Sequence, residues 1–353
     1  VYHYFMNTLR KTYFNSWFTL ISKSQAPLVC FFLLSLAYTQ LEASERLRLG
    51  TLVPKGSSYF NHLKQMEGVW KQAPGGGVAV SIYPDGRLGG EAEMVRRMRG
   101  GQIQVGLLTV AGLAEIEPRV VGLQQAPMIF RSIDEVEHVM QELGKDLEIM
   151  MEQKGFKVLG WTHAGWVHFF AKEPVQTIDD VRAAKLFCWA GSPEIVEIFQ
   201  HNGFRPVPLE TKDIVPGLQT GMITCVPMPP MAANFSQVDT RAPYMLKVNW
   251  GALAGGLVMT KEAWDKLTPE QGKHLLAAAL KATESIQADG LREAEESIKA
   301  MQQRGLKVIE PTGPQLDQWY AETAKAYPEI RERVTEPAIF DRVNDILKNY
   351  RNR

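Results

Sequence analysis

The spacing of hydrophobic and polar positions changes repeatedly along residues 46–226. Short apolar runs bounded by glycine, proline or aspartate predict β-strands, and apolar residues recurring every three or four positions between them predict amphipathic helices. The predicted strands are 47–52, 78–83, 103–108, 156–160, 166–171, 185–189, 205–208 and 222–226. The predicted helices are 59–71, 91–99, 178–183, 193–201 and 211–219.

Strands that alternate with helices are typical of an α/β fold built on a parallel sheet. The alternation occurs twice, before residue 110 and after residue 156, and 353 residues exceed the usual size of one domain. We therefore expect two α/β lobes. Folds of this kind bind ligands in crevices at the carboxyl ends of their parallel strands.

The C-terminal third has a different pattern. Residues 269–304 contain no proline after Pro269 and only two glycines, and they are rich in alanine, glutamate, lysine and leucine. Thr268 and Pro269 are typical of a helix start, and Gly305 is typical of a helix end. A helix of about 36 residues would be on the order of 54 Å long. Its apolar positions do not keep the strict heptad of a coiled coil, so we expect it to lie across both lobes.

The N-terminal segment has the pattern of an export signal. Basic residues (Arg10, Lys11 and Lys23) precede the apolar run 26–37, and a small residue, Ala43, follows a polar stretch. A spanning helix needs about 20 apolar residues, and this run is shorter. We predict that 1–43 is a signal peptide and that the mature protein is exported and soluble. An uncleaved N-terminal anchor is the alternative.

Charge and motif content argue against several functions. The chain has 39 basic and 39 acidic residues, so it lacks the basic excess that nucleic-acid binding favours. The seven histidines are scattered, and there is no Gly-x-Ser-x-Gly elbow. The glycine run 75–77 lacks the lysine and the serine or threonine of a phosphate-binding loop. We therefore expect no enzyme, no cofactor and no nucleic-acid partner.

Two cysteines remain after the predicted cleavage, Cys188 and Cys225. An oxidising compartment would permit a disulfide between them, although two buried free thiols are the favoured interpretation. A zinc site that also used His163 and His168 is conceivable, but the spacings lack the close Cys or His pairs of known zinc motifs. No metal site is predicted.

Four segments in order resemble a known protein family. They are Tyr83–Glu91 (Tyr-Pro-Asp-Gly-Arg-Leu-Gly-Gly-Glu) with 99–103, then 126–130, then 207–209 with 217–221, and lastly the long helix. Together they resemble the solute-binding proteins of tripartite ATP-independent periplasmic (TRAP) transporters, of the dicarboxylate-binding type. The resemblance covers nearly all of residues 46–350.

The resemblance implies a periplasmic protein with the two-lobed periplasmic-binding-protein fold, in which hinge strands join the lobes. It implies a first lobe over 46–165 with 255–268, and a second lobe over 166–254 with the C-terminal helices. The long helix, 269–304, would span both lobes, and 305–353 would form a C-terminal strand and helices. Ligand would be enclosed when the lobes close, and then delivered to the TRAP membrane subunits. The glycine-rich segments near Gly165 and over 250–256 are the expected hinges.

The sequence departs from the family where the resemblance places polar ligand contacts. An arginine that pairs with a ligand carboxylate is replaced by Phe187, an asparagine by Met228, and a further arginine of some members by Val167. Other basic residues could substitute for the missing arginine. These are Lys172, Arg182, Lys185, Arg205 and Arg241.

Aromatic and methionine side chains fall at or beside the family's cleft positions. The second lobe and the hinge would contribute Trp166, Phe187, Trp189, Met228, Met231 and Trp250. The first lobe would contribute the hydroxyl of Tyr59 and the carboxylate of Glu91, although an acid at a helix start is also favourable for the helix dipole alone. Such walls stack on and bury a ligand instead of pairing with its charge. We predict an apolar or aromatic, weakly charged ligand.

Three alternatives stay open at this point. A substitute arginine or lysine would make the protein a carboxylate-binding TRAP receptor. A receptor of the same fold could deliver its ligand to a sensor protein instead of a transporter. The functional form could also be an oligomer, on which the sequence is silent.

Overall fold

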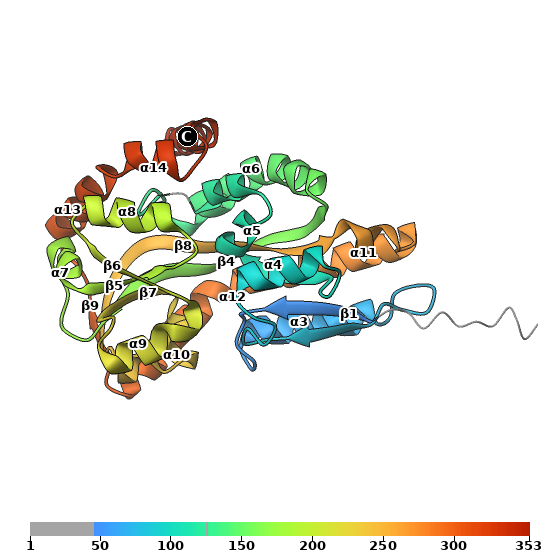
Figure 1. The fold of residues 1–353 in the computed structure, drawn as a ribbon, viewed down its shortest axis with the longest axis horizontal. Helices are drawn as coiled ribbons and strands as arrows, with labels where there is room; N and C mark the ends of the chain where they lie inside the picture. The colour runs from blue at the N-terminus through green and yellow to red at the C-terminus, as the bar shows by residue number, and fades with distance from the viewer. Residues whose placement is uncertain (1–45, 125) are drawn as a thin grey trace, which may run out of the picture. The chain divides into compact units, whose positions relative to one another are not determined.

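A mixed sheet of nine strands runs through the described part of the chain, residues 46–124 and 126–353 of a computed structural model (Figure 1). The predicted signal peptide, 1–43, lies outside the described residues. The strand order is β2-β1-β3-β8-β4-β7-β5-β6, and β9 pairs with β8. The strands are β1 (Leu47–Thr51), β2 (Val80–Tyr83), β3 (Val105–Thr109), β4 (Phe156–Ala171), β5 (Lys185–Trp189), β6 (Arg205–Leu209), β7 (Cys225–Met228), β8 (Tyr244–Thr260) and β9 (Lys307–Ile309).

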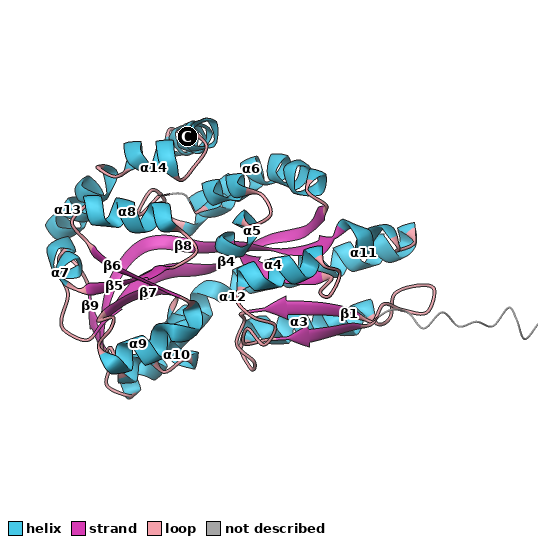
Figure 2. Cartoon of the chain, in the orientation of Figure 1, coloured by secondary structure: helices cyan, strands magenta, loops and turns pink. Residues whose placement is uncertain are grey.

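Helices cover both faces of this sheet, as Figure 2 shows. The α-helices of the first half of the chain are α3 (Ser58–Trp70), α4 (Glu91–Arg99), α5 (Val110–Ala114), α6 (Ile133–Gln153), α7 (Ile178–Ala183) and α8 (Pro193–His201). Those that follow are α9 (Ile214–Thr220), α10 (Pro230–Phe235), α11 (Lys261–Asp265), α12 (Pro269–Gln303), α13 (Gly313–Ala324), α14 (Tyr327–Arg333) and α15 (Pro337–Arg351). Short 3-10 helices are η1 (Pro118–Leu123), η2 (Thr211–Asp213) and η3 (Val238–Thr240).

The sheet has two parallel halves, and each half forms the centre of one lobe of the periplasmic-binding-protein fold. In the first half β1 lies between β2 and β3, with Leu49 paired to Ile82 and to Val105. In the second half β5 lies between β6 and β7, with Leu186 paired to Pro206 and to Cys225. The predicted two-lobed α/β fold is confirmed.

Two long antiparallel strands, β4 and β8, run through the middle of the sheet and belong to both halves. β4 pairs with β8 from Phe156 to Ala171, and the pairing shifts register between His163 and Trp166. The prediction of two separate strands, 156–160 and 166–171, was therefore wrong. Gly165 has a φ of 75° and forms a bulge, and the chain continues through it instead of turning back.

Two further elements begin three residues later than predicted. The predicted helix 211–219 begins as η2 and becomes α-helical only at Ile214, ending at Thr220 before a left-handed Gly221. The predicted strand 222–226 begins only at Cys225, because the N–H of Ile223 returns to the carbonyl of Gly217 and closes the end of α9.

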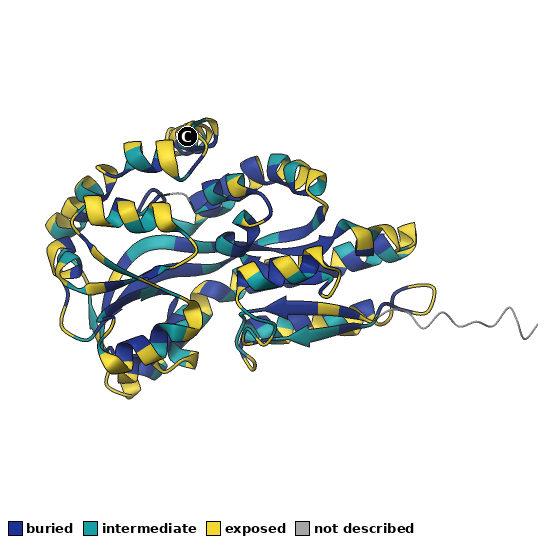
Figure 3. Ribbon diagram, in the orientation of Figure 1, coloured by how far each residue is buried: buried dark blue, intermediate teal, exposed yellow. Residues whose placement is uncertain are grey.

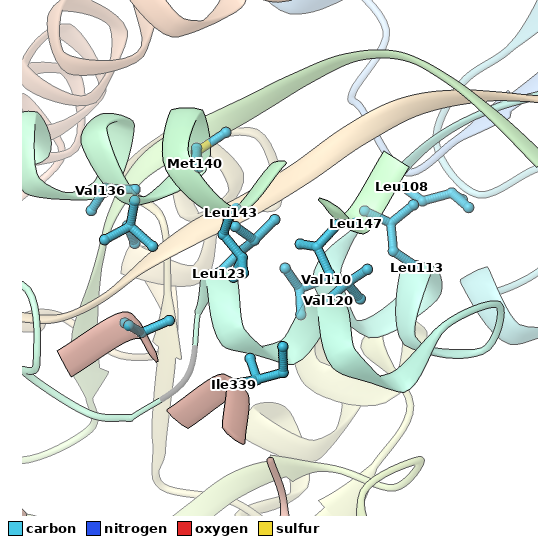
Figure 4. Packing of buried hydrophobic residues seen from close by; sticks show 14 of the residues in the cluster. Leu108, Val110, Leu113, Val120, Leu123, Val136, Met140, Leu143, Leu147 and Ile339 are labelled. Atoms are coloured by element: carbon cyan, nitrogen blue, oxygen red, sulfur yellow. The ribbon is translucent and has the colours of Figure 1, made fainter. Parts of the chain in front are cut away.

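Buried side chains lie between the sheet and its helices, and the exposed positions lie on the outer helix faces (Figure 3). Figure 4 shows part of the largest cluster, in which Leu147 of α6 lies beside Val110 and Val120. Ile339 of α15 joins the same cluster, so the last helix packs in the core of the first half. Trp319 of α13, in contrast, packs in a cluster of the second half.

The long helix α12 begins and ends almost where the sequence predicts. A capping box between Thr268 and Gln271 fixes its start, with Pro269 at the first helical position. Leu275 and Ile286 pack in a cluster with β1, β3 and α3 of the first half, and Met301 packs with the helices of the second half. The helix thus spans both lobes, and its small residues allow close contact with the sheet.

Candidate functional site

The carboxyl edges of the two parallel halves approach each other. Glu210 directly follows β6 in the second half, and Gly90 directly precedes α4 in the first half. A carboxylate oxygen of Glu210 lies 3.7 Å from the point where a Cβ atom would stand on Gly90. Parallel α/β folds bind ligands at such edges, and here the edges of both lobes meet. The space between them is the candidate binding cleft.

Three of the predicted residues come together on the second-lobe edge. Leu186 of β5 pairs with Cys225 of β7, so the same register sets Trp189 level with Met228 at the strand ends. Phe187 and Met228 both pack against one hydrophobic cluster of this lobe. Phe187 and Trp189 are half-buried, and Met228 is buried. Phe187, Trp189 and Met228 together form the apolar edge of the second lobe.

The ring of Trp189 is held against the backbone. A Cβ atom on Gly191 would lie only 2.3 Å from the ring edge of Trp189, so a larger residue at this position would displace the ring. The ring is therefore packed over the turn that follows β5. A partly exposed indole is a suitable platform for stacking.

Two predicted tryptophans lie in hydrophobic cores. Trp166 of β4 is buried in the cluster that holds α6 and α15. The ring of Trp250 on β8 lies among four aromatic rings, with centroid distances of 5.0 to 6.4 Å. Those rings are Phe169, Phe199, Phe204 and Trp319. The neighbours of both tryptophans give each of them a packing role.

Tyr59 and Met231 share one cluster in which α3, α10 and α12 take part. The Tyr59 hydroxyl is buried and has no hydrogen-bond partner among the described residues. It lies against α12, where a Cβ atom on Gly290 would be 3.1 Å away. Burial raises the pKa of Tyr59, and the nearby acids Glu293 and Asp289 raise it further. The phenol is therefore neutral at physiological pH.

Glu91 opens α4, and its carboxylate is engaged within the first lobe. It accepts hydrogen bonds from the N–H and hydroxyl of Thr109, at 2.7 and 2.5 Å, and from the N–H of Gly112 at 3.1 Å. These bonds tie the start of α4 to the end of β3 and the start of α5. Burial raises the pKa of Glu91, and the three donors oppose that shift.

The basic residues offered as substitutes for the missing arginine lie at the other edge of the second lobe. Lys185 and Arg205 begin β5 and β6, and their side chains donate to the carbonyls of Gly221 and Ala183. Lys172 follows the end of β4, beside the start of β7. Arg182 lies on α7 and Arg241 precedes β8, close to the same edge. A shallow surface hollow also lies there, lined by Lys185, Gln200, Phe204, Arg205, Pro206, Val207 and Met222.

Sequence reasoning missed Glu210 and two cations near the cleft. Arg87 lies in the turn after β2, and Lys212 lies in η2 after β6. Both are exposed, and neither side chain forms an ion pair with another residue that the structure describes. Their positions directly after predicted strands were the available signal, because residues after parallel strands gather at the carboxyl edge.

Cys188 and Cys225 are free and buried. Burial raises the pKa of Cys188 to about 11 and that of Cys225 to about 12, so both thiols are protonated. Among the described residues no group of three or more His, Cys, Asp or Glu side chains is placed to hold a metal ion. Over the same residues, no helix is long and apolar enough to span a bilayer.

Comparison with known proteins identifies the family. The model of bacterial extracellular solute-binding proteins, family 7, matches residues 49–333. The chain belongs to this family. It is 26% identical over 273 residues to the 2,3-diketo-L-gulonate-binding periplasmic protein YiaO of Escherichia coli, covering 76% of this chain and 81% of the relative.

Solved structures of TRAP periplasmic solute-binding proteins share the fold. One from Chromohalobacter salexigens, with bound D-glucuronate, has a TM-score of 0.79 at 20% identity and covers 86% of this chain and 99% of its own. Another, from Desulfovibrio salexigens with bound orotic acid, has a TM-score of 0.78 at 17% identity, with the same coverage. With the family match over residues 49–333, the protein is a periplasmic solute-binding protein of the TRAP type, as the resemblance predicted.

Proposed function

We propose that this family 7 protein captures a small, largely apolar or aromatic, weakly charged molecule and delivers it to TRAP membrane subunits. The lobes would close over the ligand by bending of β4 and β8 near Gly165 and within 250–256. The single observation that carries the ligand class is the apolar edge of Phe187, Trp189 and Met228, at positions where the family resemblance places polar contacts.

The distribution of positive charge supports this ligand class. The five substitute cations lie at the amino edge of the second lobe. Two of them, Lys185 and Arg205, are held there by hydrogen bonds that their side chains donate to backbone carbonyls. A carboxylate in the cleft would therefore lack a partner from this set. Moving an unpaired carboxylate out of water costs several kcal/mol, which disfavours dicarboxylates.

Burial alone can supply the affinity for an apolar ligand. A ring of moderate size that loses about 200 Å² of exposed area gains roughly 5 kcal/mol at about 25 cal/mol per Å². Stacking on the indole of Trp189 adds about 1 kcal/mol. The sum is about 6 kcal/mol before the cost of ordering the ligand, so these contacts alone give a Kd no tighter than roughly tens of micromolar.

A carboxylate ligand is the second candidate function. The related structures hold D-glucuronate and orotic acid, which are both acids. In this chain Arg87 and Lys212 are exposed cations beside the carboxyl edges, one from each lobe. A ligand carboxylate could bridge them at the rim of the cleft, without any arginine at position 187.

Calorimetry with D-glucuronate, orotic acid and succinate distinguishes the two candidates. We expect no measurable binding to the wild type. Mass spectrometry of the purified protein, native and then denatured, should in turn detect an apolar molecule released from the cleft. Micromolar binding of one acid, lost on Arg87→Ala or Lys212→Ala, would instead establish the carboxylate receptor.

Phe187→Arg tests the position directly. The variant should lose the co-purified molecule, because it buries an unpaired charge, and it should gain affinity for D-glucuronate. Phe235→Arg is the matched control. Phe235 is an exposed phenylalanine on α10, and its substitution adds the same charge away from the apolar edge. Equal behaviour of the two variants would contradict the assigned role of Phe187.

Delivery to a transporter is separable from delivery to a sensor. If the partner is a TRAP transporter, vesicles that contain the membrane subunits should take up the ligand. This uptake should depend on this protein and on a sodium or proton gradient. A sensor partner predicts binding without uptake.

A further inference from the structure

His163 lies at the register shift where β4 crosses between the lobes. Its Cα partner on β8 is Ala254, and the next paired residue, Trp166, faces Ala252. Two residues of β4 thus oppose one residue of β8, which is the arrangement of a β-bulge. Gly165 supplies the left-handed conformation of the bulge, with a φ of 75°.

The histidine ring closes this bulge with a hydrogen bond. The N–H of Gly165 donates to Nδ1 of His163 at 3.2 Å, and Nε2 lies 3.2 Å from a carboxylate oxygen of Glu137 on α6. An Nδ1 that accepts cannot carry a proton, so the single proton of the neutral ring is on Nε2 and is donated to Glu137. The ring is fully buried, and one tautomer satisfies both contacts.

The bulge is also packed against the long helix. The carbonyl of Gly290 on α12 lies 3.7 Å from the point where a Cβ atom would stand on Gly165. The Tyr59 hydroxyl of α3 lies 3.1 Å from the point where a Cβ atom would stand on Gly290, and the backbone nitrogen of Gly165 lies 3.7 Å from the same point. A change in the backbone conformation of the bulge would therefore disturb its packing against both α3 and α12. The bulge lies where β4 passes from one lobe to the other.

We propose that His163 is a positioning residue for lobe closure, whose neutral form fixes the bulge of β4 and whose protonated form releases it. This inference rests on the proposed closure of the lobes but not on the ligand class. Protonation at Nδ1 sets an N–H against the N–H of Gly165, which breaks the hydrogen bond and makes the two groups repel. The bulge then loses its fixed geometry, and the angle between the lobes is less defined.

Charged groups approach the ring of His163 from α6 and α12. Glu137 on α6 contacts the ring itself. On α12, Asp289 and Glu293 flank Gly290, and they bond to His62 and to Ser58 of α3. Tyr59 is the neutral phenol described above. The facing residues of β8, Ala252, Leu253 and Ala254, carry no ionisable group.

Burial and Glu137 act on the ring in opposite directions. Burial lowers the pKa of His163 and is the larger effect, and the hydrogen bond and charge of Glu137 raise it. The ring is therefore neutral at pH 7, and protonation occurs below the ordinary histidine value of about 6.5. The closed form should therefore become less favourable at mildly acidic pH. The periplasm experiences such pH values when the external medium is acidic.

The first experiment measures the tautomer without any ligand. In the full-length protein labelled uniformly with 15N, we expect the His163 ring at pH 7.5 to show an unprotonated Nδ1 and a protonated Nε2. Its titration midpoint should lie below 6.5, and the Gly165 amide resonance should shift at the same midpoint. A proton on Nδ1 at pH 7.5, or a Gly165 amide that does not follow the titration, would overturn the proposal.

The second experiment measures the lobes. Spin labels on Arg87→Cys and Lys212→Cys report the distance across the cleft, because the two cysteines of the described residues, Cys188 and Cys225, are buried. In the ligand-free protein the distance distribution should widen as the pH falls from 7.5 to 5.0. His163→Asn places a carbonyl oxygen near the Nδ1 position and does not titrate, so its distribution should stay narrow over this range.

His168 provides the matched control. It is also buried on β4, but its Nδ1 lies 2.9 Å from the carbonyl of Val248 and so donates in both protonation states. His168→Asn should keep the pH response of the wild type. A His163→Asn variant that also keeps that response would overturn the assignment. The ligand calorimetry described above fails or succeeds independently, because no ligand is used here.

Discussion

The carboxylate of Glu210 in the second lobe lies at the amino end of α4 in the first, 3.7 Å from the point where a Cβ atom would stand on Gly90. Gly90 is the N-cap of α4 and offers no side chain to the unpaired N–H groups of the first turn. An acid from the opposite lobe is therefore favourably placed near a helix amino end. This contact links the two lobes directly at the rim of the cleft.

Glu210→Gln should weaken lobe closure while keeping the shape of the side chain. A carboxylate at a helix start contributes about 0.3–1 kcal/mol, so the ratio of closed to open molecules should fall by up to about fivefold. The spin-label distance across the cleft, recorded at low ionic strength, measures this ratio. Glu194→Gln is the control, since Glu194 is an exposed acid in the first turn of α8 in the same lobe. Equal effects of both substitutions would show that the contact with α4 is unimportant.

Most of the fold was predictable because its local signals agree with its tertiary structure. The capping residues of α12 and the short apolar runs of β1, β3 and β5 match their elements closely. The two central strands were not predicted as continuous strands. Gly165 interrupts the local pattern of β4, and the strand continues past it only because β4 pairs with β8 on both sides of the bulge. Helix α6 was missed although Ser132 caps it and acids fill its first turn.

The candidate site was predictable only in part. Positions at strand ends, such as Trp189 and Met228, follow from the chain order and from the family resemblance. An apolar side chain carries no information about which face of a strand it occupies, however. Trp250 therefore resembled a cleft residue in the sequence, whereas its ring packs among other aromatic rings on β4, α8 and α13 and in the loop before β6.

Gly191→Ala should change ligand binding more than stability. The new Cβ atom would lie 2.3 Å from the ring edge of Trp189, so the indole must rotate away from the turn. The loop is exposed at this point, and the unfolding free energy should fall by no more than about 1 kcal/mol. The yield of co-purified ligand, measured by native mass spectrometry, should drop severalfold. Gly68→Ala on α3, whose Cβ atom would meet no atom within 4 Å, should leave that yield within about twofold. Unchanged ligand in Gly191→Ala would argue against a stacking role for Trp189.

Glu91 predicts a pH dependence of stability. Its pKa in the folded state is raised above 4.5, so between pH 4.5 and the raised value the folded protein binds more protons than the unfolded chain. The stability contributed by Glu91 therefore decreases as the pH rises through this window. Urea unfolding of the wild type and of Glu91→Gln at several pH values should show their difference shrinking from pH 4 upward. Glu93→Gln, which removes a half-buried ion pair with Arg97 on the same helix, should not show this trend. A difference that grows with pH would contradict the raised pKa.

Tyr59 and Gly290 should be energetically coupled. The Tyr59 hydroxyl is buried without a described partner, so Tyr59→Phe should raise the unfolding free energy by about 1 kcal/mol. Gly290→Ala gains about 1 kcal/mol of helix propensity but sets a methyl group 3.1 Å from that hydroxyl, and the two effects should nearly cancel.

In the double variant the phenyl ring lacks the oxygen, so the alanine at position 290 should add its full gain of about 1 kcal/mol. Urea unfolding of the four proteins forms a double-mutant cycle with a coupling energy of about 1 kcal/mol. Gly272→Ala in the same helix, which would contact Trp264 at 3.3 Å, is the control and should be additive with Tyr59→Phe. Additivity at position 290 as well would mean that the hydroxyl does not approach α12, and Tyr59 would then be available to the cleft as the polar group that the sequence predicts.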